Sequence, residues 1–142
     1  MNTTLRQVTR VAAYGLLTQE DQILLCRISK QFPAMEGQWT LPGGGIEWRE
    51  SPVDAMIREV KEETGLIVES AGLACVNDNR VDVDDIEYHG IRILYHAKII
   101  GGELTAELDG TTDLCDWWSK RDLEQIDLVD LAQYGVDLVF GN

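Results

Sequence analysis

Three glutamates in the segment from Gly44 to Leu66 would lie on one side of a helix. Glu59 and Glu63 are four residues apart, and Glu62 follows Glu59 by three. At these spacings side chains are neighbours on a helix surface, and like charges repel unless a cation or solvent separates them. Carboxylates without histidine or cysteine suit Mg²⁺, Mn²⁺ or Ca²⁺ and not zinc. The cluster therefore indicates either a divalent-cation site or a solvated acidic helix face.

A run of glycines precedes this helix. Gly43, Gly44 and Gly45 follow Pro42 directly. Because glycine has no Cβ, a ligand can approach the backbone closely there. The N-terminus of the following helix also offers N–H groups to phosphate oxygens. Glycines and acids together favour a site for a phosphorylated ligand bound with a metal ion.

The same segment resembles the Nudix box, GX5EX7REUXEEXGU, in which U is an aliphatic residue. Gly44, Glu50 and the run from Arg58 to Leu66 match every position of this motif without a gap. The residues from Trp39 to Gly43 lead into the box as they do in many members. Arg49 is one small departure, because many relatives have glycine before the glutamate.

This resemblance implies the fold and the reaction. The fold would be of the α/β class, a Nudix-type α/β/α sandwich with a mixed β-sheet between helices. The reaction would be hydrolysis of the diphosphate linkage in a nucleoside diphosphate joined to another moiety, with Mg²⁺ as cofactor and Mn²⁺ as a possible substitute. Such an ion neutralises the diphosphate, lowers the pKa of a bound water and stabilises charge on the leaving phosphate.

The resemblance also assigns roles to the acids of the box. Glu59, Glu62 and Glu63 would bind the metal together with the backbone carbonyl of Gly43. Either Glu59 or Glu62 would instead help to position or deprotonate water.

Arg58 and the residues around the glycines are the expected substrate side of the site. Arg58 would mainly orient the carboxylates, with Glu50 as its partner; gripping a substrate phosphate is the alternative. The substrate would contact Gly43, Gly44, Trp48 and Arg58. Trp48 and Phe32 flank the glycines, where they would either sandwich a base or sugar or simply pack.

A further acid is often supplied by a loop outside the box in members of this family. The candidates are Asp109, Asp113, Asp116 and the acidic cluster from Asp82 to Glu87. Asp113 is favoured because it lies four residues before Trp117, in the segment leading into the next strand. An ordinary turn aspartate is the alternative interpretation. His89 and His96 lack metal-ligand spacing and indicate structural or surface roles.

Secondary structure must position these residues within one domain, residues 1–142. Ser51 as N-cap, Pro52 at the first helical position and Gly65 after the last turn predict a helix between them. Two further helices are expected over Lys120–Ile126 and Val129–Phe140. The run from Asp78 to Glu87 is expected to be a solvated loop, with a substrate gate as the alternative. Strands are expected over Val8–Leu17, Gln22–Ile28, Gln38–Leu41, Leu66–Val76, Tyr88–Ile100 and Thr111–Ser119.

The amino-acid composition argues against several classes of binding partner. Twelve Lys and Arg against 25 Asp and Glu give a net charge of −13. This balance argues against nucleic acid and against an anionic membrane surface. A small phosphorylated nucleotide then needs a cation from outside the chain. The composition does not decide whether the protein forms a homodimer.

Cysteine content and hydropathy predict a cytoplasmic location. Cys26, Cys75 and Cys115 fit neither a disulfide framework nor a zinc site, and buried thiols are expected. No 18-residue apolar stretch and no signal-peptide pattern is evident.

Two other functions compete with the hydrolase. A Nudix-fold sensor that binds a nucleotide without cutting it is less favoured, because every box carboxylate is present. A Ca²⁺-binding module is disfavoured, because the acidic run lacks the EF-hand pattern. The substrate stays open between nucleoside triphosphates and nucleotide sugars such as ADP-ribose. Val81 stands where many ADP-ribose enzymes have proline, and a tyrosine typical of dinucleoside polyphosphate enzymes is missing near residue 83.

Overall fold

A computed structural model describes residues 5 to 141. It contains a seven-stranded sheet, two α-helices and a short 3-10 helix. The helices are α1 (Pro52–Thr64), η1 (Asp122–Gln125) and α2 (Asp130–Phe140). The strands are β1 (Arg6–Gln19), β2 (Gln22–Ile28), β3 (Trp39–Thr40), β4 (Gly43–Gly45), β5 (Leu66–Val83), β6 (Ile86–Gly102) and β7 (Thr112–Ser119).

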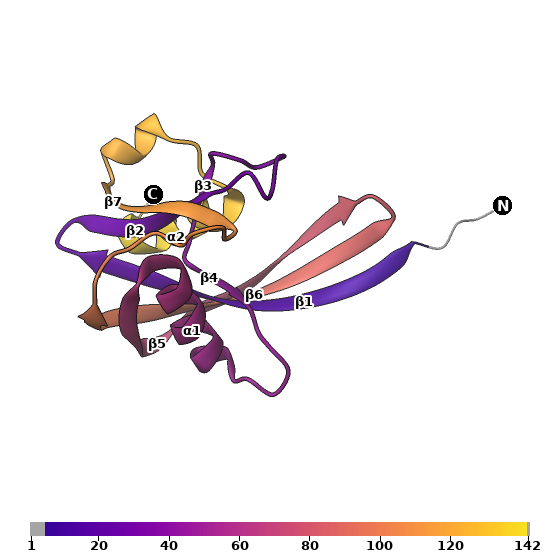
Figure 1. Cartoon of the computed structure of the whole chain (residues 1–142), viewed down its shortest axis with the longest axis horizontal. Helices are drawn as coiled ribbons and strands as arrows, with labels where there is room; N and C mark the ends of the chain where they lie inside the picture. The colour runs from indigo at the N-terminus through magenta and orange to yellow at the C-terminus, as the bar shows by residue number, and fades with distance from the viewer. Residues whose placement is uncertain (1–4, 142) are drawn as a thin grey trace.

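The sheet is mixed, as the sequence predicts, and β1 lies at its centre (Figure 1). The strand order is β3-β2-β1-β6-β5, while β4 pairs with β1 and β7 pairs with β2. β1 runs parallel to β6 from Arg6 to Leu17. The other strand pairs are antiparallel. β4 pairs with β1 at Ala12–Tyr14, and the expected hairpin of β1 and β2 joins these strands only at Thr18 and Gln19.

The two α-helices cover opposite faces of the sheet. Met56 and Val60 of α1 pack with Leu17 and Leu24, whereas α2 packs against the neighbouring residues Leu16 and Ile23. Successive residues of a strand point to opposite faces, so the two clusters lie on either side. Burying each such side chain contributes roughly 1.5–3 kcal/mol. The α/β/α sandwich is confirmed.

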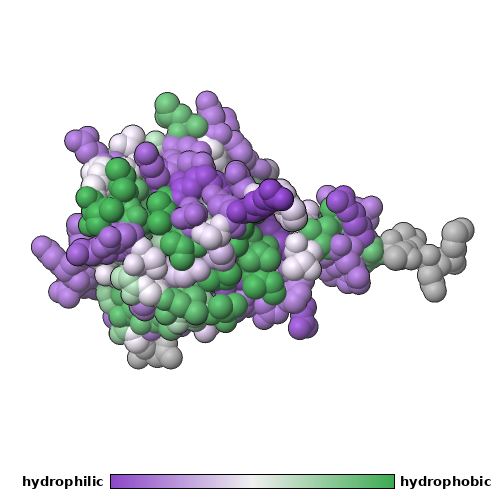
Figure 2. All heavy atoms as spheres, turned by 90° about the horizontal axis from the view of Figure 1, so that it is seen from below, coloured by the Kyte–Doolittle hydropathy of each residue, from purple (hydrophilic) through white to green (hydrophobic). Residues whose placement is uncertain are grey.

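The acidic run from Asp78 to Glu87 is not a loop, and this prediction was wrong. It forms the outer part of the β5–β6 hairpin, with Asp84 and Asp85 alone at the turn. Residues 81–85 are all exposed, so charged side chains in extended backbone need no burial there. With the first half of β1, these strands form an arm that projects from the body, as Figures 1 and 2 show. We call residues 6–11, 77–83 and 86–91 the arm.

The chain after β7 is less helical than predicted. Of the segment from Lys120 to Ile126, only the four residues of η1 are helical. Ile126 returns to extended backbone, because the chain then pairs with Trp39: the Trp39 N–H donates to Asp127 O at 2.8 Å, and the Val129 N–H donates to Trp39 O at 3.1 Å. Trp118 also packs edge-on against Trp39, with ring centroids 5.0 Å apart. In residues 5 to 141 no helix has the length and hydropathy to cross a membrane.

Candidate active site

Helix α1 begins and ends where local sequence signals place it. The Ser51 hydroxyl accepts a hydrogen bond from the Asp54 N–H at 3.1 Å, and Pro52 opens the first turn. Gly65 has φ of +76°, and its N–H donates to Lys61 O at 2.9 Å. Such an N-cap contributes about 1 kcal/mol, and the left-handed C-cap favours glycine. These ends fix the register in which the box glutamates are presented.

Arg58 gathers the acids of the box around one guanidinium. Its Nε and Nη2 donate to the two oxygens of Glu50 at 2.7 and 2.8 Å, so this contact is bidentate. Nη1 donates to Glu59 at 2.8 Å and to Glu62 at 3.4 Å, and Nη2 donates to Gly45 O at 3.1 Å. A guanidinium has five N–H donors. These acceptors occupy all of them, which leaves none for a substrate phosphate.

The ion pair between Arg58 and Glu50 is strong enough to shift both groups. The hydrogen bonds from Arg58, with that from the Glu47 N–H, lower the pKa of Glu50 to about 2. Glu50 in turn raises the pKa of Arg58, so the guanidinium stays charged. The glycine loop is thereby fastened to the side of α1.

Glu63 is the most buried acid of the box. It is 3% exposed, and its Oε2 is buried without a hydrogen-bond partner. Burial raises the pKa of Glu63 well above its usual value, and the charge of Glu59 adds to this, while a hydrogen bond from the Gly43 backbone lowers it. The Cys115 thiol donates to Glu63 O at 3.1 Å. Burying an unpartnered carboxylate is costly, so this oxygen indicates a missing positive partner.

The glycines of β4 let α1 approach the sheet. β4 was not expected as a strand, yet Gly43, Gly44 and Gly45 pair with β1. A Cβ on Gly44 would lie 2.6 Å from the Glu59 carboxyl carbon, and one on Gly43 would lie 2.5 Å from Tyr14 Cα. Both contacts are closer than a side chain allows. The Glu59 carboxylate therefore rests directly on the backbone of the glycine run.

The donor set fits a hard divalent cation. Glu59, Glu62 and Glu63 supply carboxylate oxygens on adjacent turns of α1, one of them buried and unpartnered. Within residues 5–141 no three His, Cys, Asp or Glu side chains have donor atoms already converged on one point. The Arg58 guanidinium instead bonds Glu59 and Glu62. The residues thus fit such an ion chemically, while the structure does not fix its coordination.

Glu107 is an acid near the box that sequence reasoning missed. Burial raises its pKa, and the charges of Glu62 and Glu59 raise it further. Its loop is fastened to the end of α1, because the Thr105 N–H donates to Thr64 O at 2.8 Å. This long-range contact, with the pairing of Leu66 and Gly102, holds the segment before Glu107 at the end of α1. An acidic residue in the loop before the last strand is a weak sequence signal for a catalytic acid, because Asp109 and Asp113 show the same feature.

Asp113, the favoured acid outside the box, is engaged elsewhere. It accepts a hydrogen bond from Arg27 Nε at 2.8 Å, and both side chains are about two-fifths exposed, at 44% and 40%. Among the described residues it makes no hydrogen bond or ion pair with α1. The electrostatic influence of Glu59 and Glu62 on Glu107 favours Glu107 over Asp113 as the acid near the box.

Two residues of the loop between β4 and α1 stand out. Arg49 has φ of +69°, in the left-handed region that glycine adopts freely. This explains physically why many relatives have glycine there. Trp48 is 90% exposed, so the expectation that it packs does not hold. Phe32 is 46% exposed and lies in a different loop.

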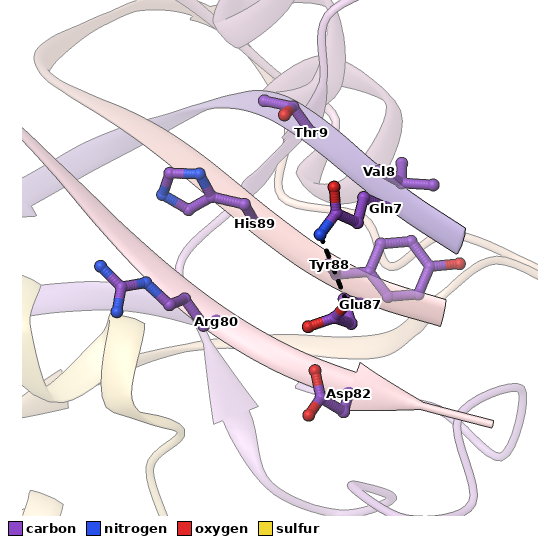
Figure 3. Close-up of a pocket in the computed structure, with 8 residues that line it drawn as sticks. All are labelled: Gln7, Val8, Thr9, Arg80, Asp82, Glu87, Tyr88 and His89. Atoms are coloured by element: carbon purple, nitrogen blue, oxygen red, sulfur yellow. Dashed lines mark hydrogen bonds between the residues drawn. The ribbon is translucent and has the colours of Figure 1, made fainter. Parts of the chain in front are cut away.

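Two hollows differ in their relation to the box. The larger, about 690 Å³, lies on the arm between residues such as Gln7, Arg80 and His89, and none of its lining residues belongs to the box (Figure 3). The smaller, about 180 Å³, is lined by Arg10, Tyr14 and Arg92 among others, and no box residue lines it either. It adjoins β4, because a Cβ on Gly45 would lie 3.4 Å from Arg10 Nη2. We therefore relate the smaller pocket to the site.

The cysteines are free thiols. Cys26 and Cys115 are buried as expected and their sulfurs lie 3.0 Å apart, whereas Cys75 is only half-buried. Burial raises the pKa of the Cys26 thiol well above its usual value. His89 donates or accepts a hydrogen bond with Asp78 on the arm, and His96 is exposed. This agrees with surface roles for both histidines.

Comparison with known proteins places these features in a family. The model of the NUDIX domain matches residues 8–136. An ADP-ribose pyrophosphatase from Methanocaldococcus jannaschii is 38% identical over 68% of this chain and 54% of its own length. The 8-oxo-dGDP phosphatase NUDT18 of Homo sapiens is 30% identical over 83% of this chain and 34% of its own. The chain thus spans about half the length of these curated relatives, or less.

Solved structures agree with the sequence matches. A MutT NUDIX hydrolase from Burkholderia pseudomallei superposes with a TM-score of 0.75 at 28% identity, covering 93% of this chain and 98% of that one. A second neighbour, an ADP-ribose pyrophosphatase from Streptococcus suis, has a TM-score of 0.62 at 25% identity, covering 91% and 86%. The complete box on a capped helix, the sandwich fold and the family match lead to one conclusion. The chain belongs to the Nudix hydrolase family.

Proposed function

We propose that this protein hydrolyses the diphosphate linkage of a small nucleotide with the help of a divalent metal ion. The observation that carries this proposal is the buried, unpartnered Oε2 of Glu63 beside Glu59, against a strand of glycines. A solvated acidic helix face does not account for a glutamate that is 3% exposed. Mg²⁺, or Mn²⁺ in its place, is the ion we propose.

The residues divide the work as follows. Glu59, Glu62 and Glu63, with the carbonyl of Gly43, would hold the ion, which when bound supplies charge neutralisation and a water of lowered pKa. Glu59 or Glu62 would position the attacking water or accept a proton from it. Arg58 would hold these carboxylates in place, since its donors are all used within the protein. Glu107 would be the acid outside the box.

The substrate would lie along β4. Its diphosphate would contact the backbone of Gly43 and Gly44, beside the Glu59 carboxylate. Its nucleoside would reach the pocket lined by Arg10 and by Arg92, which is paired with Asp130 at the same pocket. The exposed Trp48 ring offers an apolar face for a base or sugar.

The substrate class rests on the relatives. An ADP-ribose pyrophosphatase and an 8-oxo-dGDP phosphatase are both similar to this chain and both act, by name, on a nucleoside diphosphate derivative. We therefore propose nucleoside triphosphates and nucleotide sugars such as ADP-ribose as the first compounds to test, in a cytoplasmic setting. A non-catalytic sensor is the second candidate, and the complete set of box carboxylates speaks against it.

The test is a substrate panel in ¹⁸O-labelled water. Nucleoside triphosphates, ADP-ribose and dinucleoside polyphosphates are incubated with the protein and Mg²⁺, and the products are analysed by mass spectrometry. We expect one class to yield a nucleoside monophosphate, with the label showing which phosphorus was attacked. Binding of a nucleotide without any product from the panel would favour the sensor.

Mg²⁺ is expected to stabilise the protein against heat in a concentration-dependent way. A ligand that binds only the native state adds RT ln(1 + [L]/Kd), which is about 2.7 kcal/mol at a hundredfold excess over Kd. Differential scanning calorimetry of the wild type and of the Glu59→Gln, Glu63→Gln double variant measures this. The rise in Tm should be absent from the variant. An equal rise would place the metal elsewhere, for example among the acids of the arm.

Glu107→Gln is expected to lower kcat by about tenfold to a hundredfold, within the range typical of one acid–base group. Asp113→Asn is the matched control, because it also neutralises a loop acid but breaks only the ion pair with Arg27. Its kcat should stay within about twofold of wild type, since exposed ion pairs contribute little. Steady-state kinetics decide between them. The reverse order of effects would restore Asp113 as the acid outside the box.

A further inference from the structure

The outer edge of the arm is an open strand. β5 is the last strand of the sheet, and within residues 5–141 its far edge pairs with nothing. Apolar side chains are exposed along it: Val76 at 56%, Val81 at 45% and Val83 at 47%. In Figure 2 the arm carries hydrophilic and apolar side chains side by side. A long edge of this kind is a template for pairing with another strand.

Some charged side chains along this edge have a partner within the described residues, and Arg80 does not. Asp78, Arg80 and Asp82 alternate with uncharged residues, so they share one face of β5. Asp78 of β5 shares a hydrogen bond with His89 of β6 at 2.7 Å. On the neighbouring strands, Gln7 of β1 donates to Glu87 of β6 at 3.4 Å. Arg80 makes no ion pair within the described residues, and Figure 3 shows it on the outermost strand with the other strands on one side only.

A second copy of the same strand can satisfy Arg80. When two identical strands pair antiparallel in one continuous sheet, the twofold axis passes through a single residue, because paired side chains must share a face. An axis at Asn79 places Arg80 of each copy opposite Asp78 of the other, which forms two reciprocal ion pairs. No like charges then face each other between residues 75 and 83.

Other registers and edges are less favourable. An axis at Asp78 or at Arg80 sets identical charges against each other. An axis at Val81 would pair Arg80 with Asp82, but it sets Asp78 against Asp84 of the turn and leaves fewer residues of β5 to pair beyond the axis. The free edge of β1 carries Arg6 and Arg10 without an acid, and pairing about Val8 would oppose them. A contact between β1 and β5 would be head-to-tail and would extend into filaments rather than close.

We propose that the protein forms a homodimer in which β5 of one copy pairs antiparallel with β5 of the other about an axis at Asn79. The two three-stranded arms then become one continuous six-stranded sheet. The Arg80–Asp78 pairs select the register. The interface lies on the arm and contains no box residue, although Asn79 at the axis also lines the smaller pocket.

Charge reversal tests the register. In a dimer of the Arg80→Asp variant, the new aspartate of each copy would face Asp78 of the other, so both ion pairs become repulsive. Arg6→Asp is the matched control, because it makes the same charge change on the same arm, on β1. In the Asp78→Arg, Arg80→Asp double variant the charges are exchanged and both ion pairs return. Sedimentation equilibrium gives the dimer Kd of each protein, and thermal unfolding checks that each variant folds.

We expect the wild type to be dimeric, and Arg80→Asp to raise the dimer Kd by at least about tenfold, since two cross-strand pairs become repulsive. Arg6→Asp should change the Kd by less than about twofold, and the exchanged variant should regain the wild-type value. Amide hydrogen exchange of residues 77–81 provides a readout without mutation: their protection should rise with protein concentration. A wild type that stays monomeric, equal weakening by Arg80→Asp and Arg6→Asp, or an exchanged variant that remains monomeric would each overturn the proposal.

Discussion

Glu63→Gln is expected to reduce kcat by at least about 10³-fold. Metal ions contribute several kcal/mol of transition-state stabilisation in reactions of this kind, and each 1.36 kcal/mol is a factor of ten. Glutamine keeps the size of the side chain but removes the charge that would hold the ion. Glu63 is buried and accepts a hydrogen bond from the Gly43 backbone, so the substitution acts at the centre of the proposed site.

The same substitution should leave the metal-free fold as stable as the wild type, or slightly more so. Burial and the charge of Glu59 already raise the pKa of Glu63, so the folded chain disfavours its ionised form. A neutral amide relieves this repulsion. Glu69→Gln, an exposed acid on β5, is the control and should leave both kcat and Tm unchanged. Near-wild-type turnover of Glu63→Gln at saturating Mg²⁺ would contradict the assignment of the metal site.

Arg58→Lys is expected to lower kcat by about 10²-fold with little change in KM. The guanidinium holds Glu50 in a bidentate contact while it bonds Glu59 and Glu62. An ammonium has three donors and no planar fork, so it cannot hold these groups at once. A displacement of about 1 Å in catalytic groups can cost about 10²-fold in rate, even when substrate binding is unaffected.

The alternative role for Arg58 predicts the opposite kinetic pattern. If Arg58 gripped a substrate phosphate, Arg58→Lys would raise KM and leave kcat nearly normal. Arg121→Lys, at an exposed position beside η1, is the control for the general effect of replacing arginine. Steady-state kinetics on the substrate found in the panel separate the two roles.

The local part of the site could be read from the sequence. Ser51, Pro52 and Gly65 set the ends of α1 through contacts within a few residues, and the resulting register puts the box glutamates on one side. The spacing of Arg58 and Glu50 likewise suggested their ion pair, and the structure brings them together at 2.7 Å. Such features depend on short-range geometry, which is the same in any fold.

The remaining features depend on contacts between distant segments. Glu107 comes near the box through long-range contacts such as that of Thr105 with the end of α1, and no spacing rule connects residues 64 and 105. The acidic run of the arm is strand because β6 pairs with both β5 and β1, including a parallel pair between segments about 80 residues apart. Charge alone suggested a loop there. Pairing partners, not composition, decided its conformation.

The most direct test of the metal-site hydrolase is the rate of substrate hydrolysis as a function of free Mg²⁺ after treatment with EDTA. The wild type should be inactive without Mg²⁺ and should regain full activity along a saturable curve. The Glu59→Gln, Glu63→Gln variant, folded as judged by its Tm, should stay inactive at every Mg²⁺ concentration. Hydrolysis at an undiminished rate in EDTA, or equal recovery in the variant, would contradict the account.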